Sequence, residues 1–245
     1  MAVAGDTVKS VSTVRDGLDR VRGQIGEAAE RAGRDPAGVR LIAVSKGFPI
    51  PTISAAVEAG QLDFGENRVQ ELRTKYDQAP EGVRWHFIGR LQRNKVGKLV
   101  PMADVIHSID SVELARQVGS RAERPVQVLL EVNVSGEDRK GGIAPSRLPE
   151  LVEAVLETRH LDLIGLMTMA PRLEDPELAR PAFRQLAELR ARMAETYSYA
   201  SIHHLSMGMS QDYRVAIEEG STMVRVGEAI FGPRAKSRDP SESER

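Results

Sequence analysis

Eight short apolar segments recur along the chain, separated by stretches of mixed character. Between most of them, apolar residues recur every three or four positions, which is the spacing of one helical face. This spacing predicts helices over 53–59, 112–121, 148–158 and 181–196, and another over 8–32 before the first apolar segment. The segments themselves are predicted strands and occupy 39–45, 62–64, 84–89, 104–109, 126–134, 161–169, 201–207 and 223–227.

The alternation and the chain length together indicate the fold. Strands buried on both faces of a parallel sheet appear in sequence as continuous apolar runs, as these do. Eight strand–helix units in 245 residues match the size of a single (β/α)8 TIM barrel, with a doubly wound open sheet as the alternative. Because no linker-like stretch divides the chain, we expect one domain over 1–232. Residues 233–245 are charged and nearly free of apolar side chains, which predicts a disordered tail.

Composition narrows the classes of partner. Lys and Arg number 34 against 35 Asp and Glu, so there is no basic excess of the kind that binds nucleic acid or acidic membranes. The absence of cysteine excludes disulfides and thiolate metal sites and fits a reducing compartment. No segment has the length of a signal-peptide core or of the ~20 apolar residues that span a bilayer. These features predict a soluble, cytoplasmic protein that binds a small molecule.

Polar residues follow the predicted strands, where barrel active sites are built. Lys46 ends the apolar run "LIAVSK", and Glu66 and Asn67 follow the second strand in "FGEN". An unpaired ammonium is costly to bury, so Lys46 is either solvated or held for chemistry. For Asn67, and for Asp110 after the fourth strand, capping of the next helix is the alternative interpretation.

The last two strand ends carry groups that suit an anion. We expect the seventh strand to end near Leu205, a loop with Gly208 to follow, and a helix to start near Ser210 with Asp212 in its first turn. The eighth strand end, "MVRVGEAIFG", offers Arg225 as a cation and Gly227 at a helix start. Ser206, Gly208, Ser210, Arg225 and Gly227 together predict a phosphate site. The alternative is an ordinary turn glycine and an ordinary N-cap serine.

A phosphate site opposite a lysine suggests a phosphorylated carbonyl compound held as a Schiff base. Pyridoxal 5′-phosphate (PLP) is the commonest ligand of that description. Arg90, Arg93 and Lys95 are cations that could lower the pKa of such a lysine, or they form a solvated loop. The alternative is an aldolase or decarboxylase that forms the Schiff base with its own substrate.

Several blocks in order along the chain resemble the signatures of the pyridoxal-phosphate homeostasis protein family. The blocks are "LIAVSKGFP", "FGENRVQEL", "WHFIGRLQRNK", "IHSIDS", "LLEVNVSGEDRKGG", "GLMTMAP" and "LSMGMSQDYRVAIEEGSTMVRVGEAIFG". The resemblance implies the barrel of the alanine racemase N-terminal domain, a PLP Schiff base at Lys46, and a role in buffering and delivering the cofactor that affects amino-acid and keto-acid balance. By position, Ser206, Ser210, Arg225 and Gly227 match the phosphate- and ring-binding blocks, and Asn67 lies near the cofactor. Whether Arg225 faces the phosphate or the pyridine nitrogen stays open.

The alternative function is a small PLP-dependent racemase, which needs a second base. Tyr213 is the candidate, whereas His86, His107 and the pair His203 and His204 lie in or beside apolar strands, where core packing is the simpler interpretation. Because the sequence continues only a short way past the last motif, we expect it to lack the C-terminal domain on which racemase dimers depend. We therefore expect a monomeric, non-catalytic carrier whose partners are PLP and, transiently, PLP-dependent apo-enzymes.

Overall fold

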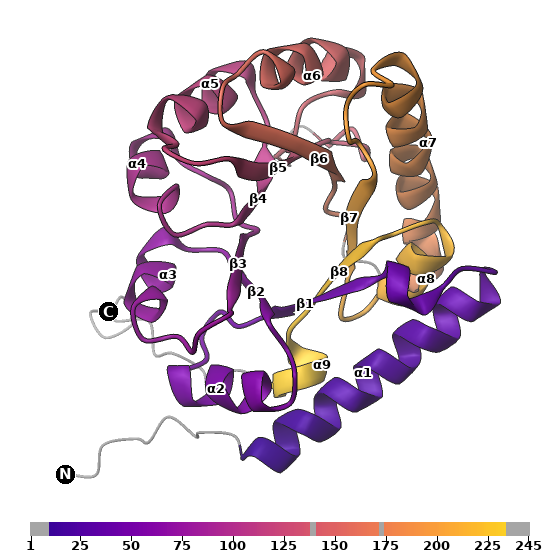
Figure 1. Cartoon of the computed structure of the whole chain (residues 1–245). Helices are drawn as coiled ribbons and strands as arrows, with labels where there is room; N and C mark the ends of the chain where they lie inside the picture. Colours follow the sequence, from indigo (N-terminus) through magenta and orange to yellow (C-terminus); the bar gives the residue numbers. More distant parts are fainter. Residues whose placement is uncertain (1–9, 138–140, 172–173, 234–245) are drawn as a thin grey trace, which may run out of the picture.

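Eight parallel strands close into a barrel in the computed structural model of the protein, which describes residues 10–137, 141–171 and 174–233 (Figure 1). Each strand pairs with the next in sequence, and β8 pairs with β1 through Arg40–Met223 to Ala43–Val226. The barrel prediction is confirmed, and closure excludes the doubly wound sheet. The strands are β1 Arg40–Val44, β2 Asp63–Glu66, β3 Arg84–Phe87, β4 Val105–Ile109, β5 Val126–Glu131, β6 Leu161–Met167, β7 His204–Met209 and β8 Met223–Val226.

A helix follows every strand, and the helices together cover the outside of the barrel. Their apolar faces pack on the sheet, as for Phe183, Leu186, Leu189 and Met193 of α7. The α-helices are α1 Val11–Arg31, α2 Ile50–Glu58, α3 Val69–Tyr76, α4 Val96–Leu99, α5 Val112–Arg121, α6 Leu148–Leu156, α7 Arg180–Thr196, α8 Tyr213–Glu218 and α9 Glu228–Phe231. Short 3-10 turns lie at η1 Pro36–Gly38, η2 Arg93–Lys95, η3 Pro145–Arg147 and η4 Pro176–Ala179.

Helix α1 covers the place where the barrel closes. The helix after β8, α9, has only four residues, so it is too short to cover the last strand. The 21-residue α1 takes that place and runs beside α2, α8 and α9 along the side where β1 and β8 meet (Figure 1). Ser10 caps it by accepting a hydrogen bond from the Thr13 amide. Its buried face includes Val14, Leu18, Val21 and Ile25.

The inside of the barrel is partly apolar and partly polar. A compact apolar cluster fills one part and consists of Ile42, Val105, Leu129, Ile164, Met167 and Met223. Beside it lie polar side chains that are fully buried, among them His86, His107 and Ser206. The larger apolar core lies between the strands and the surrounding helices. Polar groups sealed inside a barrel require hydrogen-bond partners, and these are described below.

Two predicted boundaries near the candidate site were wrong, and so was the interpretation of Asp110 as a helix cap. Strand β7 continues through Gly208 to Met209, so Gly208 lies in the strand at φ 92° instead of in a loop. Helix α8 begins at Tyr213, with Asp212 as its N-cap residue, three residues after the predicted start at Ser210. Helix α5 is capped by Ser111, whose Oγ accepts from the Leu114 amide, and not by Asp110.

Two other expectations concern the ends of the chain and membranes. The tail predicted to be disordered falls, apart from Pro233, at 234–245, outside the described residues, as do residues 8 and 9 of the first predicted helix. Within the described residues, no helix combines the length and the apolar character needed to cross a bilayer.

Candidate functional site

A cavity of about 620 Å³ opens at the carboxyl ends of the strands. It is the end of the barrel where polar residues follow the strands, as the sequence analysis predicted. Five of the predicted site residues line it, namely Lys46, Asn67, Ser210, Arg225 and Gly227. Arg90, Glu131, Thr168 and Met209 line it as well. Ser206 and Gly208 do not line it, since both lie deeper in β7.

Lys46 follows the last residue of β1 and a serine that is tied into a buried polar cluster. The Ser45 hydroxyl donates to Glu66 Oε1 at 2.7 Å. Lys75 Nζ, on α3, donates to the Ser45 carbonyl at 2.8 Å and to Glu66 Oε1 at 2.6 Å. Ser45, on the amino side of Lys46, is therefore held at its backbone carbonyl by Lys75 and at its hydroxyl by Glu66.

The same cluster reaches the residue after Lys46. Glu71 accepts from the Gly47 amide and, at 2.7 Å, from Lys75 Nζ. Burial raises the pKa of Glu66, although the nearby Lys75 ammonium opposes the rise. Sequence reasoning missed Lys75 and Glu71, because charges on a helical segment usually indicate a solvated face. Their effect is to fix the backbone on both sides of Lys46.

The loop after β7 meets the end of β8 at Ser210 and Gly227. The Gly227 amide donates to Ser210 Oγ at 3.4 Å, and Asp212 Oδ1 accepts from the Met209 amide at 2.6 Å. A Cβ at Gly227 would lie 3.0 Å from the Val44 carbonyl oxygen, so glycine lets the two strand ends approach. Helices α8 and α9 have six and four residues, too short for strong end effects. The groups suited to binding an anion are therefore the Ser210 hydroxyl and the Gly227 backbone amide.

Arg225 lies deeper, two residues before Gly227 on β8, and is 4% exposed. Its Nη1 donates to Ser206 Oγ at 2.6 Å and its Nη2 to the Thr168 carbonyl at 2.9 Å. Burial lowers the pKa of Arg225 to about 10, opposed by the charges of Asp212 and Glu131. The guanidinium therefore stays protonated near neutral pH, and its remaining N–H groups are available to the cavity.

Glu131 is a cavity residue that the sequence analysis did not single out. It ends β5, is 7% exposed, and has its carboxylate beside Gly141. Burial, with Asp110 nearby, raises the pKa of Glu131 to about 7, while Arg225 and Arg90 oppose the rise. The signal in the sequence is the acidic residue that closes the apolar run "VQVLLE".

The other candidates lie elsewhere. Tyr213 is 3% exposed, and its hydroxyl donates to Gln24 Oε1 on α1, away from the cavity. Arg93 donates to Gln117 on α5, and neither it nor Lys95 lines the cavity, whereas Arg90 does. Asn67 is not the cap of α3, whose N-cap residue is Arg68. Among the residues that the structure describes, no group of three His, Asp or Glu side chains could hold a metal ion.

The residues fit a phosphorylated aldehyde. A lysine amine can bond a carbonyl carbon, a hydroxyl and an amide can bind phosphate, and an arginine can donate to a ring nitrogen. All four groups line the same cavity. Its volume of about 620 Å³ falls in the range of small-molecule sites.

Comparisons with known proteins agree with this chemistry. The family model for the alanine racemase N-terminal domain matches residues 17–235. The pyridoxal phosphate homeostasis protein of Aquifex aeolicus is 48% identical over 221 residues, covering 89% of this chain and 96% of that protein. A structure of PipY from Synechococcus elongatus with PLP bound is 33% identical with a TM-score of 0.79, and the match covers 89% of this chain and all of that one.

A more distant structure shares only the fold. Alanine racemase from Corynebacterium glutamicum is 14% identical with a TM-score of 0.68, over 91% of this chain and 62% of that one. The family model and the 48% identity together decide the family. The chain belongs to the pyridoxal phosphate homeostasis proteins, which have the barrel of the alanine racemase N-terminal domain.

Proposed function

We propose that this protein binds PLP, holds it as a Schiff base on Lys46, and acts in PLP homeostasis in the cytoplasm, affecting amino-acid and keto-acid balance. The observation that carries the proposal is that Lys46, Ser210, Gly227 and Arg225 line one cavity. The names of its relatives and the PLP bound to PipY support it. Bound PLP supplies an electron-poor ring that can withdraw electrons from an attached amine.

We assign each group a part of the ligand. Ser210 and the Gly227 amide bind the phosphate at the rim, and Asn67 contacts the ligand from the end of β2. Arg225 donates to the pyridine nitrogen, because it lies below the Ser210–Gly227 pair and its orientation is set by Thr168 and Ser206. A protonated arginine keeps that nitrogen unprotonated, which weakens electron withdrawal and favours storage over chemistry. Ser206 acts through Arg225, and Gly208 acts through the shape of β7.

Lys46→Ala tests the Schiff base directly. Wild-type protein incubated with PLP should show a visible absorbance band that borohydride removes, and peptide mapping should place the reduced adduct on Lys46. Lys46→Ala should lose both signals. The matched control is Lys95→Ala, a lysine on η2 that does not line the cavity, and it should keep both. A full-occupancy, reducible adduct in Lys46→Ala would overturn the assignment.

Delivery of PLP needs a separate test. Loaded protein mixed with a PLP-dependent apo-enzyme should restore that enzyme's activity faster than the same concentration of loaded protein held behind a dialysis membrane. Equal rates of reactivation with and without the dialysis membrane would show that PLP is simply released into solution.

We also propose that the protein is a monomer. Light scattering after size-exclusion chromatography would check its molecular mass.

A catalytic function is the second candidate. Glu131 favours it, since this carboxyl lines the cavity with Lys46 and its pKa is raised to about 7 by burial. A carboxyl with this pKa can exchange a proton near neutral pH, whereas the Tyr213 hydroxyl is bonded to Gln24 and Tyr213 does not line the cavity. The test is incubation of loaded protein with single L-amino acids in deuterium oxide. Catalysis would be supported if the α-proton exchanges with wild-type protein and does not exchange with Glu131→Gln. If wild-type protein gives no exchange, the non-catalytic carrier function is favoured.

A further inference from the structure

A continuous chain of buried hydrogen bonds crosses the inside of the barrel from Arg225 toward its opposite end. Arg225 Nη1 and Ser206 Oγ are 2.6 Å apart, and Ser206 Oγ lies 2.8 Å from His107 Nδ1. His107 Nε2 lies 2.9 Å from His86 Nδ1. His86 Nε2 lies 2.8 Å from Asp63 Oδ1. The chain thus joins residues of β8, β7, β4, β3 and β2.

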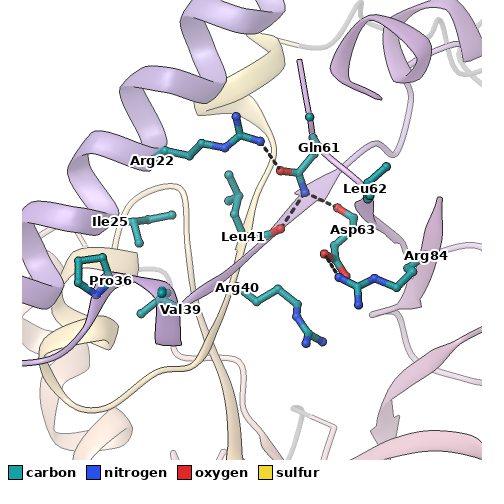
Figure 2. A pocket seen from close by; sticks show the side chains of 12 residues that line it. Arg22, Ile25, Pro36, Val39, Arg40, Leu41, Gln61, Leu62, Asp63 and Arg84 are labelled. Atoms are coloured by element: carbon teal, nitrogen blue, oxygen red, sulfur yellow. Dashed lines mark hydrogen bonds and ion pairs between the residues drawn. The ribbon is translucent and has the colours of Figure 1, made fainter. Parts of the chain in front are cut away.

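The far end of the chain lies in a second cavity. Asp63 Oδ2 accepts from Arg84 Nη2 at 2.6 Å, and both residues line a cavity of about 520 Å³ at the amino ends of the strands. Figure 2 shows this ion pair, with Gln61 bonded to the Asp63 backbone carbonyl and to Leu41. The two cavities of the barrel are therefore connected by side chains that are almost fully buried.

The chemistry of the two ends decides the direction of every hydrogen bond. Arginine can only donate and an ionised carboxylate can only accept. Arg225 donates to Ser206, so the Ser206 hydroxyl hydrogen is free to donate to His107 Nδ1. His107 then carries its hydrogen on Nε2 and donates to His86 Nδ1.

The same reasoning fixes the last link. With Nδ1 accepting, His86 carries its hydrogen on Nε2 and donates it to the Asp63 carboxylate. Both rings are then neutral and protonated on Nε2, and every donor in the chain has one acceptor. No other arrangement of neutral rings satisfies both ends.

The charges around the chain agree with this arrangement. Burial lowers the pKa of His86 and places the pKa of His107 well below its usual range. Arg40 from β1, His204 from β7 and Arg225 from β8 also disfavour a charge on His107. Burial alone would raise the pKa of Asp63, but the hydrogen bonds from His86 and Arg84 lower it, so the carboxylate stays ionised.

We propose that Asp63, His86, His107 and Ser206 are positioning residues that orient the Arg225 guanidinium toward the ring of the bound cofactor. The inference rests on the proposed function, since it assumes PLP next to Arg225. Asp63 anchors the chain with a full negative charge from the far end of the barrel. A carboxylate that never contacts the cofactor thereby contributes to how tightly its ring is held.

The tautomers can be tested without any cofactor. Nitrogen-15 NMR of the apo protein at pH 7.5 should show two of its five histidines neutral and protonated on Nε2, assigned by His86→Gln and His107→Gln. A spectrum in which either ring is protonated on Nδ1 would overturn the proposal. This result does not depend on PLP binding.

The effect on the cofactor is tested with Asp63→Asn. Asparagine keeps the size but removes the charge, and we expect roughly tenfold weaker PLP binding and a shifted pH midpoint of the visible band. Asp162→Asn is the matched control, because Asp162 is also a strand carboxylate, on β6, and it accepts a hydrogen bond from Gln127 Nε2 at 3.5 Å, outside the chain of buried hydrogen bonds. It should bind PLP as wild type does.

A second variant separates charge from stability. In Asp63→Asn the Arg84 guanidinium faces the new amide group without a charged partner, so we expect a lower melting temperature. Adding Arg84→Gln removes this guanidinium, so the melting temperature should recover while PLP binding stays weak. Recovery of both, or Asp63→Asn binding as tightly as Asp162→Asn, would overturn the proposal. If wild-type protein bound no PLP, the proposed function would fail instead, and the NMR result would still decide the tautomers.

Discussion

Glu131 makes the stability of the apo protein depend on pH. Its pKa is raised from 4.5 to about 7 by burial, so between these values the native state binds more protons than the unfolded chain. The free energy of unfolding must then fall as pH rises from about 4.5 to about 7. Glu131→Gln should leave stability unchanged near pH 4.5 and increase it by about 1–3 kcal/mol at pH 8.

Urea unfolding at pH 4.5 and pH 8 measures this effect. Glu27→Gln is the control, because Glu27 is exposed on α1, and it should change stability equally little at both values. A Glu131→Gln protein that is less stable than wild type at pH 8 would contradict the prediction, since the carboxylate would then be stabilising.

Lys75 is a residue on which one buried carboxylate, Glu66, and one half-buried carboxylate, Glu71, depend. Its side chain is 7% exposed and lies 2.6 Å from Glu66 and 2.7 Å from Glu71. Removing one partner of a buried ion pair leaves an uncompensated charge. Lys75→Met should therefore lower the free energy of unfolding by about 3–5 kcal/mol and slow PLP attachment to Lys46.

The control for Lys75 is Lys98→Met, on the exposed side of α4. It should change the free energy of unfolding by less than about 0.5 kcal/mol. Equal, small effects of both substitutions in urea unfolding would show that the cluster beside Lys46 contributes nothing. Stopped-flow absorbance at the visible band measures the rate of PLP attachment in both variants.

Sequence reasoning identified five residues that line the cavity, but it missed the buried side chains that hold them in place. Topology alone brought the five cavity residues together, because Lys46, Asn67, Ser210 and Gly227 follow strands and Arg225 lies near the end of β8. The partners depend on side-chain direction across the fold, which no local pattern contains. His86 and His107 were interpreted as core histidines, and they are buried as expected, but a bond between rings 21 residues apart cannot be seen in either strand alone.

At the scale of elements, all eight strands were predictable because each lies in or beside a short segment with buried apolar residues, although in β2, Asp63–Glu66, Phe64 is the single large one. The error at β7 has a specific cause. In the sequence, Gly208 looks like a turn residue. In the structure it lies within β7, at φ 92°, where the strand passes close to α8. A glycine serves a close approach as well as a turn, and sequence does not distinguish the two.

Gly208→Ala tests this close approach. A Cβ there would lie 2.6 Å from Ala216 Cβ and 2.8 Å from Tyr213 Cα, in a backbone conformation that alanine resists. We expect a loss of about 2 kcal/mol or more in the free energy of unfolding and weaker PLP binding, because α8 and the Ser210 loop shift. Gly23→Ala is the control: nothing lies near it on α1, so it should stabilise by about 0.5–1 kcal/mol. If the Gly208→Ala protein were as stable as wild type, α8 could not lie as close to Gly208 as the structure shows.

At the scale of the whole molecule, closure of the barrel joins the two ends of the described chain. Strand β8 pairs with β1, and α1 packs on α2, α8 and α9 across that seam. No strand can leave without opening the ring, so damage at the seam should be felt in strands that do not touch it. Trp85 of β3, the single tryptophan and 2% exposed, lies two strands from β1 and reports on such a strand.

Leu18→Ala at the seam should therefore shift the unfolding of the entire barrel. Leu18 is fully buried on α1, and its truncation should cost about 2–5 kcal/mol. Trp85 fluorescence and far-UV circular dichroism should move to the same lower urea midpoint, because α1 and β3 unfold together. Leu178→Ala, at a side chain 62% exposed on η4, should move neither. If Leu18→Ala lowered the circular dichroism midpoint and left the Trp85 midpoint at its wild-type value, α1 would be an independent layer, and the barrel would close without it.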